Sequence, residues 1–463
     1  MSDSPVTYPD RIEIAPLTKP PLATVRVPGS KSITNRALVL AALNNPVGCE
    51  LEGALLSEDT EMMMGAMRRL GFYAAPRRDL SEPVLKVFSH DRGRSIPSDN
   101  AELFVGNSGT TMRFLTAMLG LGHGRYRLDG VPRMRERPIE DLLSALRQLG
   151  VSATAEKENG CPPVVIEAKG LRGGHVKVKS NVSSQFLSGL LLAAPHAKTE
   201  VVIDIDGPLV SRPYVDMTVK MLHRLGYFIL DDYASGQLKV LSSRARDLDP
   251  DVITKKIDSA AFHDGFDPRR HTLLQDYQVE PDASAASYFA GAAAITGGAI
   301  TVPGLADNSI QGDMRFFDLL EEMGCRIERN EAGITVHGGP LTGIDADMNE
   351  ISDTVMTLAV VACFAEGPTT IRNVAHIRHK ETNRLAALAT ELRRVGAEVE
   401  ELADGLTITP RPLHGTAIET YDDHRMAMSM SLVGLRVPGV VIKNPGCVGK
   451  TYPRFFEDLE KLR

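Results

Sequence analysis

One plan repeats along the 463 residues of this chain. At five places an amphipathic stretch ends in an apolar residue followed by glycine: Leu70-Gly71, Leu149-Gly150, Leu225-Gly226, Met323-Gly324 and Val395-Gly396. A glycine at this point favours the left-handed C′ position that ends a helix. The glycines recur at intervals of roughly 75 residues, a period that indicates repeated structural units.

Each interval contains a short strand, a small-residue helix, a second strand and an amphipathic helix. A sixth unit begins near Tyr421 and runs to the C-terminal helix at 455–462. Six such units are too many to share one small hydrophobic core, but they divide naturally into two domains of three units. The sequence therefore predicts a two-domain α/β fold. Because the polar motifs lie at strand-to-helix junctions, we expect helix N-termini to form an anion-binding cleft.

One interval, from Gly226 to Gly324, is about 20 residues longer than the others. The excess lies at about 242–270, where mixed charges accompany proline and glycine. We interpret this stretch as a surface insertion, with disorder and a partner-binding loop both open.

Composition narrows the function. The net charge of −7 argues against nucleic-acid binding as the default, so anion recognition must be local. No secretory signal is visible near Met1, and the uncharged stretch 283–306 fits a buried helix, a turn and a strand better than a membrane span. The scattered cysteines indicate reduced thiols in a cytosolic protein: Cys49, Cys161, Cys325, Cys363 and Cys447.

Several segments carry groups that suit anions. Residues 28–36, Pro-Gly-Ser-Lys-Ser-Ile-Thr-Asn-Arg, place two cations and hydroxyls at a strand-to-helix turn. Residues 104–114 add two glycines, three hydroxyls and an arginine. Three arginines alternate in 132–139 before Pro138, which we expect to start a helix. For each segment, a capped helix or a solvated loop is the plainer alternative.

Later units add further candidates. Ser183-Ser184-Gln185 precede a long apolar helix, and Asp353 heads another. Residues 376–384 supply two histidines, cations and Glu381, and helical spacing would place Lys380 and Arg384 on one face, although a salt-bridged surface helix would look alike. A phosphate loop at 449–451 is excluded because Asn444 stands where the motif requires glycine. We expect no metal site at 422–424, since no partner cluster has suitable spacing.

Together these segments resemble the 5-enolpyruvylshikimate-3-phosphate synthase family closely, in order and over nearly the whole chain. The resemblance rests on 28–36, 106–110, 133–138, 183–185, Asp353, 380–384, 423–428 and 450–451. It implies two domains of three βαβαββ units around buried parallel helices. Residues 1–29 and 277–463 would form one domain, and 30–276 the other.

The resemblance also implies an activity. The family transfers the enolpyruvyl group of phosphoenolpyruvate to the 5-hydroxyl of shikimate 3-phosphate, with no cofactor or metal. The resemblance assigns catalysis to Asp353, as the base, and to Glu381 and Lys31, as proton donors. Phosphoenolpyruvate would bind Lys31, Gly109, Arg137, Gln185, Arg384, Arg425 and Lys450. Shikimate 3-phosphate would bind Lys31, Ser32, Arg36, Ser183, Ser184, Gln185, Ser211, Asp353, His376 and Lys380.

Position 376 is histidine where many relatives have asparagine, which changes the pH behaviour expected there. Two alternatives stay open. One is the sister enzyme that acts on UDP-N-acetylglucosamine, whose usual loop cysteine has no counterpart beside 133–137. The other is a non-catalytic anion-binding scaffold of the same fold. We expect a cytoplasmic monomer whose partners are the two small substrates, without nucleic acid or membrane.

Overall fold

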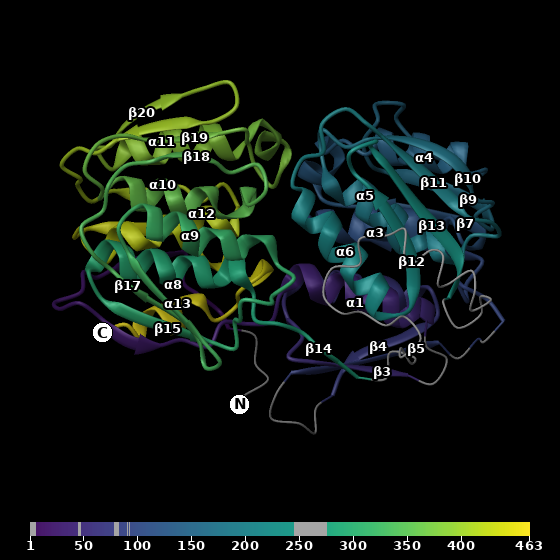
Figure 1. Ribbon diagram of the computed structural model, residues 1–463, viewed down its shortest axis with the longest axis horizontal. Coiled ribbons are helices and arrows are strands. Elements are labelled where there is room, and N and C mark those ends of the chain that lie inside the picture. Colours follow the sequence, from purple (N-terminus) through teal and green to yellow (C-terminus); the bar gives the residue numbers. More distant parts are fainter. Residues whose placement is uncertain (1–5, 45–47, 78–82, 90, 92, 245–275) are drawn as a thin grey trace. The chain divides into compact units, whose positions relative to one another are not determined.

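A computed structural model describes residues 6–44, 48–77, 83–89, 91, 93–244 and 276–463. The chain divides into two compact units, which Figure 1 colours along the sequence. Unit 1 comprises Met1–Lys31, Leu55–Glu58 and Glu280–Arg463, and unit 2 comprises Ser32–Ala54 and Asp59–Val279. These limits lie close to the domain limits expected from the sequence, which stay a prediction.

Three four-stranded sheets form unit 2, in the orders β14-β3-β5-β4, β6-β7-β9-β8 and β10-β11-β13-β12. In each sheet the first two strands are parallel and the other pairs are antiparallel. The elements are α1 (Lys31–Asn44), β3 (Cys49–Glu52), α2 (Glu58–Arg69), β4 (Phe72–Pro76), β5 (Val84–Ser89), β6 (Asn100–Phe104), α3 (Gly109–Leu119), β7 (His123–Asp129), η1 (Pro132–Glu136), α4 (Glu140–Gln148), β8 (Ser152–Ala155), β9 (Val164–Lys169), β10 (Gly174–Lys179), α5 (Ser184–Ala193), η2 (Ala194–His196), β11 (Val201–Asp206), α6 (Arg212–Arg224), β12 (Tyr227–Asp232), β13 (Gln237–Arg244) and β14 (Asp276–Gln278).

The sheets of unit 1 follow the orders β16-β17-β15-β2, β18-β19-β21-β20 and β1-β23-β22. The elements are β1 (Arg11–Ile14), β2 (Leu22–Thr24), α8 (Ala283–Thr296), β15 (Ala299–Pro303), η5 (Gly312–Met314), α9 (Arg315–Glu322), β16 (Arg326–Asn330), β17 (Gly333–His337), β18 (Asp345–Asp347), η6 (Ser352–Thr354), α10 (Val355–Ala362), β19 (Thr369–Arg372), η7 (Ala375–His379), α11 (Arg384–Arg394), β20 (Glu398–Glu401), β21 (Leu406–Thr409), β22 (Ala417–Ile418), α12 (His424–Gly434), β23 (Val440–Lys443), η8 (Pro445–Lys450) and α13 (Phe455–Glu460).

Two strands join a sheet away from their neighbours in sequence. Strand β2 comes before α1 along the chain, yet it pairs in parallel with β15 of unit 1. Strand β14 comes before α8, yet it pairs in parallel with β3 of unit 2. Each unit thus completes one sheet with a strand from the chain segment that enters or leaves it, a pairing that the repeat pattern did not predict.

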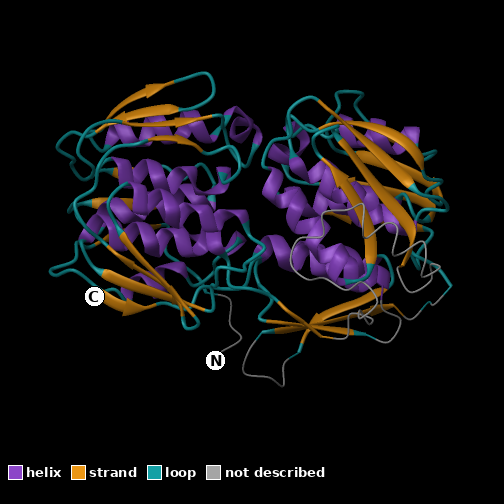
Figure 2. Ribbon diagram, viewed as in Figure 1, coloured by secondary structure: helices purple, strands orange, loops and turns teal. Residues whose placement is uncertain are grey.

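Buried helices form the core of unit 1. Small residues let α8, α10 and α12 approach closely: a Cβ on Gly291 of α8 would lie 2.9 Å from Thr357 Cγ2 of α10 and 3.2 Å from Leu432 Cδ1 of α12. Hydroxyls of Ser287, Thr357 and Ser429 also link the three helices. Figure 2 shows helices inside each unit with strands on the outside. This packing fixes the helix N-termini that carry many of the candidate residues.

Several expectations about individual elements are confirmed. All five repeat glycines have positive φ, from 79° at Gly226 to 113° at Gly324. The stretch 283–306 contains α8, a left-handed Gly297 and β15. Among the described residues, no helix combines the length and apolar character needed to cross a bilayer.

Three expectations need correction. Ser242–Arg244 belong to β13, and the rest of the predicted insertion lies outside the described residues. Helix α4 begins at Glu140, not at Pro138, with Ile139 as its N-cap. Residues 380–383 lie between η7 and α11, so Lys380 and Arg384 do not share a helical face.

Candidate functional site

The carboxylate of Asp353 is the centre of a charged cluster in unit 1. It lies in η6, directly before the apolar helix α10. Arg425 Nη2 donates to Oδ2 at 2.7 Å, and Arg384 Nη1 donates to Oδ1 at 3.3 Å. Lys380 Nζ lies 4.0 Å from Oδ1. Burial favours the neutral acid, but the cations, Arg425 foremost, outweigh it and hold the pKa of Asp353 well below its usual value. Asp353 is therefore ionised at neutral pH.

Arg384 joins three carboxylates. Its buried guanidinium donates from Nε and Nη2 to both oxygens of Asp423, at 2.7 and 3.2 Å. Nη2 also donates to Glu381 Oε2 at 2.9 Å. Although burial opposes its charge, Asp423, Glu381 and Asp353 raise the pKa of Arg384. The pairing keeps a buried cation charged and ties the start of α11 to η6 and α12.

Glu381 also contacts a second cation. Lys450 Nζ, in η8, lies 3.2 Å from Glu381 Oε1, and both side chains are buried. Glu381 thus has one oxygen on Arg384 and the other on Lys450. A carboxyl group held in this way can exchange a proton with a molecule beside it only if these ion pairs loosen or the substrate's charge competes with them.

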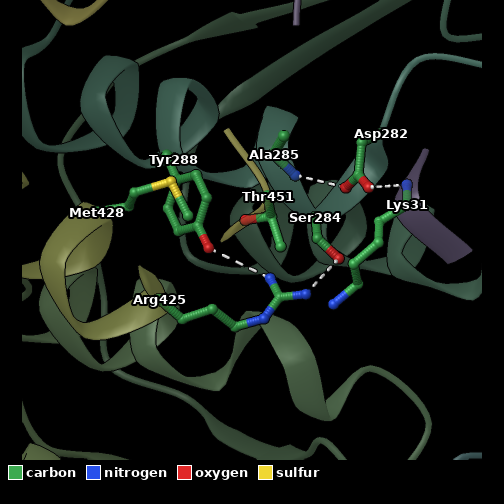
Figure 3. A pocket seen from close by; sticks show the side chains of 8 residues that line it. All are labelled: Lys31, Asp282, Ser284, Ala285, Tyr288, Arg425, Met428 and Thr451. Carbon is green, nitrogen blue, oxygen red and sulfur yellow. Dashed lines mark hydrogen bonds between the residues drawn. The ribbon is translucent and has the colours of Figure 1, made fainter. Parts of the chain in front are cut away.

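A small pocket opens beside Arg425, at the N-terminus of α8 (Figure 3). Asp282 caps this helix by accepting from Ala285 N–H at 2.8 Å, and it also accepts from Lys31 N–H at 2.9 Å. The pocket is lined by Lys31, Asp282, Ser284, Ala285, Tyr288, Arg425, Met428 and Thr451. Cations and a helix N-terminus at one opening are suited to a small anion.

Arg425 is held on its other side by Tyr288 and Ser284. Nη1 donates to the Tyr288 hydroxyl at 3.2 Å, and Nη2 lies 3.5 Å from Ser284 Oγ. Ser284 in turn hydrogen-bonds to the buried carboxyl of Asp313. Burial and the charge of Asp353 raise the pKa of Asp313 to about 6. Asp313 has no signal in the sequence, because nothing in its local pattern separates it from an ordinary helix-start residue.

Two histidines of the cluster stay neutral at physiological pH. Burial and the charge of Lys380 lower the pKa of His376 to about 3. Burial and Arg425 lower the pKa of His424 far below its usual value. His376 can therefore offer a hydrogen bond to an anion without adding charge.

A second cluster, in unit 2, surrounds the start of α3. Arg137 Nη1 donates to the Asn107 carbonyl at 3.1 Å. A Cβ on Gly109 would lie 2.4 Å from Arg137 Nη2, so glycine permits this close approach. Arg113, which the sequence analysis did not select, donates to the Pro138 carbonyl at 2.9 Å and fixes the segment that carries Arg137.

The other candidates of unit 2 gather at the starts of α5 and α6. Ser183 is the N-cap of α5 and accepts from Gln185 N–H at 3.2 Å. Gln185 Nε2 donates to Thr110 Oγ1 at 3.2 Å, which links α5 to α3. Ser184 is buried, and Ser211, the N-cap of α6, has a left-handed backbone with φ of 52°.

Arg36 of α1 is buried among neutral groups. It donates to Thr218 Oγ1 at 2.7 Å, the Tyr214 carbonyl at 2.8 Å, the Ser32 carbonyl at 2.9 Å and Ser188 Oγ at 3.1 Å. Burial lowers its pKa to about 10. These bonds connect α1 with α5 and α6. Arg36 therefore holds three helices of unit 2 together, and the binding role expected for it would be a second role.

The structure thus brings Lys31, Asp353, His376, Lys380, Glu381, Arg384, Arg425 and Lys450 into unit 1, and Ser32, Arg36, Gly109, Arg137, Ser183, Ser184, Gln185 and Ser211 into unit 2. Asp423 was visible beside Arg425, but only the fold shows that it pairs with Arg384. Within the described ranges, no three His, Cys, Asp or Glu side chains gather as metal ligands would.

Repeated strand–helix units with cations at helix N-termini define a two-unit α/β protein suited to small polyanions. Its fold matches a solved EPSP synthase from Acinetobacter baumannii with a TM-score of 0.75 at 24% identity, covering 98% of each chain. The profile of EPSP synthase (3-phosphoshikimate 1-carboxyvinyltransferase) matches residues 18–262 and 265–459.

Two relatives named 3-phosphoshikimate 1-carboxyvinyltransferase extend this match. The protein from Nostoc punctiforme is 44% identical, with 98% of this chain and 100% of the relative covered. The protein from Vibrio atlanticus is 45% identical over 95% of this chain and 96% of the relative. The chain therefore belongs to the EPSP synthase family.

Proposed function

We propose that this protein transfers the enolpyruvyl group of phosphoenolpyruvate to the 5-hydroxyl of shikimate 3-phosphate and releases phosphate, in the pathway to chorismate and the aromatic amino acids. It is a transferase whose relatives consistently carry the name of this activity. The observation that carries the proposal at the site is the carboxyl group of Asp353, which accepts hydrogen bonds from Arg425 and Arg384.

The reaction needs three proton transfers, two in the addition step and one in the elimination step. The 5-hydroxyl oxygen bonds to C2 of phosphoenolpyruvate and gives up its proton, while the methylene carbon C3 gains one. In the second step the C2–O bond to phosphate breaks and C3 loses a proton, which restores the double bond. We assign the hydroxyl proton to Asp353 and the methylene proton to Glu381 or Lys31.

The charges around Asp353 favour this division of roles. Four cations lower its pKa, which would make it a weak base in the empty protein. Two substrate anions beside these cations would offset their charge and raise the proton affinity of the carboxylate. Asp353 would thus gain basicity when both substrates are bound.

The residues assigned to the substrates lie in both units. Phosphoenolpyruvate binding is assigned to Lys31, Gly109, Arg137, Gln185, Arg384, Arg425 and Lys450. Shikimate 3-phosphate binding is assigned to Lys31, Ser32, Arg36, Ser183, Ser184, Gln185, Ser211, Asp353, His376 and Lys380. Arginine suits the carboxylate through paired hydrogen bonds, and lysine suits phosphate as a point charge. We further propose a monomer that acts in the cytoplasm.

Phosphate release tests the function directly. With phosphoenolpyruvate present, we expect release on addition of shikimate 3-phosphate and none on addition of UDP-N-acetylglucosamine. Release with the UDP-sugar would indicate the sister activity, which the comparisons do not favour. No release with either acceptor, from protein that binds both substrates, would indicate a non-catalytic scaffold.

A further inference from the structure

A strained turn precedes helix α12. Tyr421 and Asp422 both have left-handed backbones, with φ of 55° and 54°. Asp423 N–H closes the turn by donating to the Thr420 carbonyl at 2.9 Å. Residues other than glycine rarely adopt this backbone conformation, and two in succession persist only where surrounding contacts hold them.

A fully buried carboxylate supplies one such contact. The Tyr421 hydroxyl donates to Glu391 Oε1 at 2.9 Å, and the Glu391 side chain is 0% exposed. Glu391 also accepts from Glu419 N–H at 3.1 Å and from Arg394 Nη1 at 3.0 Å to each oxygen. Burial and Glu391 raise the pKa of Tyr421 to about 12, so the hydroxyl keeps the proton that it donates.

A third left-handed residue supports the turn from the other side. Asn444, with φ of 46°, donates from Nδ2 to Asp422 Oδ1 at 3.1 Å. It is also the N-cap of η8, which carries Lys450. The strain is therefore concentrated where the chain enters both α12 and η8.

The turn leads directly to the charged cluster. Asp423 caps α12 by accepting from Arg425 N–H at 2.9 Å, and the same carboxylate receives both hydrogen bonds from Arg384. Glu391 lies on α11, whose first residue is Arg384. The hydrogen bond between Tyr421 and Glu391 thus links α11 to the turn before α12, and these are the two helices whose N-terminal arginines contact Asp353.

We propose that Tyr421 and Glu391 are positioning residues, which hold the strained 420–423 turn so that Arg384 and Arg425 stay in register with Asp353. Neither residue touches the reacting atoms. The inference rests on the proposed function, because it takes these two arginines as ligands of phosphoenolpyruvate. A turn that served folding alone would affect stability and leave the KM values unchanged.

Tyr421→Phe removes the hydroxyl and keeps the ring. We expect the KM for phosphoenolpyruvate to rise about tenfold, as the loss of one hydrogen bond to a charged group allows, with the KM for shikimate 3-phosphate within about twofold. Glu391→Gln should act in the same direction. The double variant should be no worse than the poorer single variant, because both substitutions weaken the same contact between Tyr421 and Glu391.

A matched pair of variants distinguishes the effect of backbone strain near the charged cluster from the effect of backbone strain elsewhere. Asp422→Val and Glu158→Val each place a β-branched residue at a left-handed position, since Glu158, in the β8–β9 turn of unit 2, has φ of 53°. Both should lower the Tm, but only Asp422→Val should raise the KM for phosphoenolpyruvate. Equal KM effects of the two variants, or none from either, would overturn the inference.

Arg425→Ala distinguishes the two possible failures. If it raises the KM for phosphoenolpyruvate while Tyr421→Phe stays within about twofold of the unsubstituted protein, the positioning role is wrong and the ligand assignment stands. If Arg425→Ala leaves that KM unchanged, the ligand assignment is wrong and the inference falls with it.

Discussion

At the scale of residues, two carboxyl groups of unit 1, one partly buried and one fully buried, have pKa values that are shifted in opposite directions. Asp353 contacts Arg425 and Arg384 directly, and its pKa is lowered. Asp313 contacts the neutral hydroxyl of Ser284, and burial raises its pKa to about 6. The first group is ionised at neutral pH and is a weak base until bound anions offset the charge of its cations, and the second loses its charge in mildly acid solution.

We predict that substitutions of the two assigned carboxylates, Asp353 and Glu381, affect different steps of the reaction. Asp353→Asn keeps the size but removes the base, so turnover should fall by about two to four orders of magnitude while shikimate 3-phosphate still binds. Glu381→Gln should also lower turnover and should slow solvent deuterium exchange into the methylene group of phosphoenolpyruvate. Turnover assays and NMR of the exchange check both. Near-normal turnover in either variant would leave that carboxylate with an ion-pair role only.

We predict a pH-dependent stability difference for Asp313→Asn. A folded-state pKa above the unfolded value means that Asp313 contributes stability at low pH, which is lost as pH rises through about 6. The Tm of Asp313→Asn relative to the unsubstituted protein should therefore rise between about pH 4 and pH 7. Asp353 shifts in the opposite direction, but it is present in both proteins and cancels in the comparison. A difference independent of pH would contradict the prediction.

At the scale of elements, the glycines that follow helices determine where those helices end. Gly297 after α8 has φ of 70°, and Gly396 after α11 has φ of 106°. A Cβ on Gly297 would meet nothing within 4 Å, whereas one on Gly396 would lie 2.8 Å from the Pro412 carbonyl oxygen. The two glycines separate the conformational requirement from the requirement for space.

Gly297→Ala should therefore cost about 1 kcal/mol, from the left-handed backbone alone. Gly396→Ala should cost more, because a backbone oxygen must also move. Denaturant titration of the two variants measures the difference. Equal losses would show that the contact with Pro412 relaxes freely.

At the scale of the whole molecule, the assigned ligands are divided between two compact units. Each unit has its own buried core and its own cations. Two polyanionic substrates would repel each other unless cations surround them.

We predict that shikimate 3-phosphate draws the units together. Small-angle scattering should show a smaller radius of gyration when the ligand is added. Arg137→Ala should retain that compaction if shikimate 3-phosphate alone drives it, since Arg137 is assigned to phosphoenolpyruvate. An unchanged radius with ligand bound would contradict closure.

The sequence by itself determined the repeated α/β plan and most of the local geometry. The five helix-ending glycines, the cap at Ser183 and the helix within 283–306 follow from short-range chemistry that neighbouring residues specify. The family motifs likewise lie within short segments. These features need no distant partner, so a linear pattern carries them.

Only the tertiary structure decided which distant residues meet. The pairing of β2 with β15 and of β14 with β3, the pairing of Arg384 with Asp423, and the proximity of Asp313 to Arg425 through Ser284 join segments far apart in the chain. The helical face expected for Lys380 and Arg384 was wrong because the chain between η7 and α11 is not helical. Contacts of this kind depend on how whole helices pack, which local spacing does not specify.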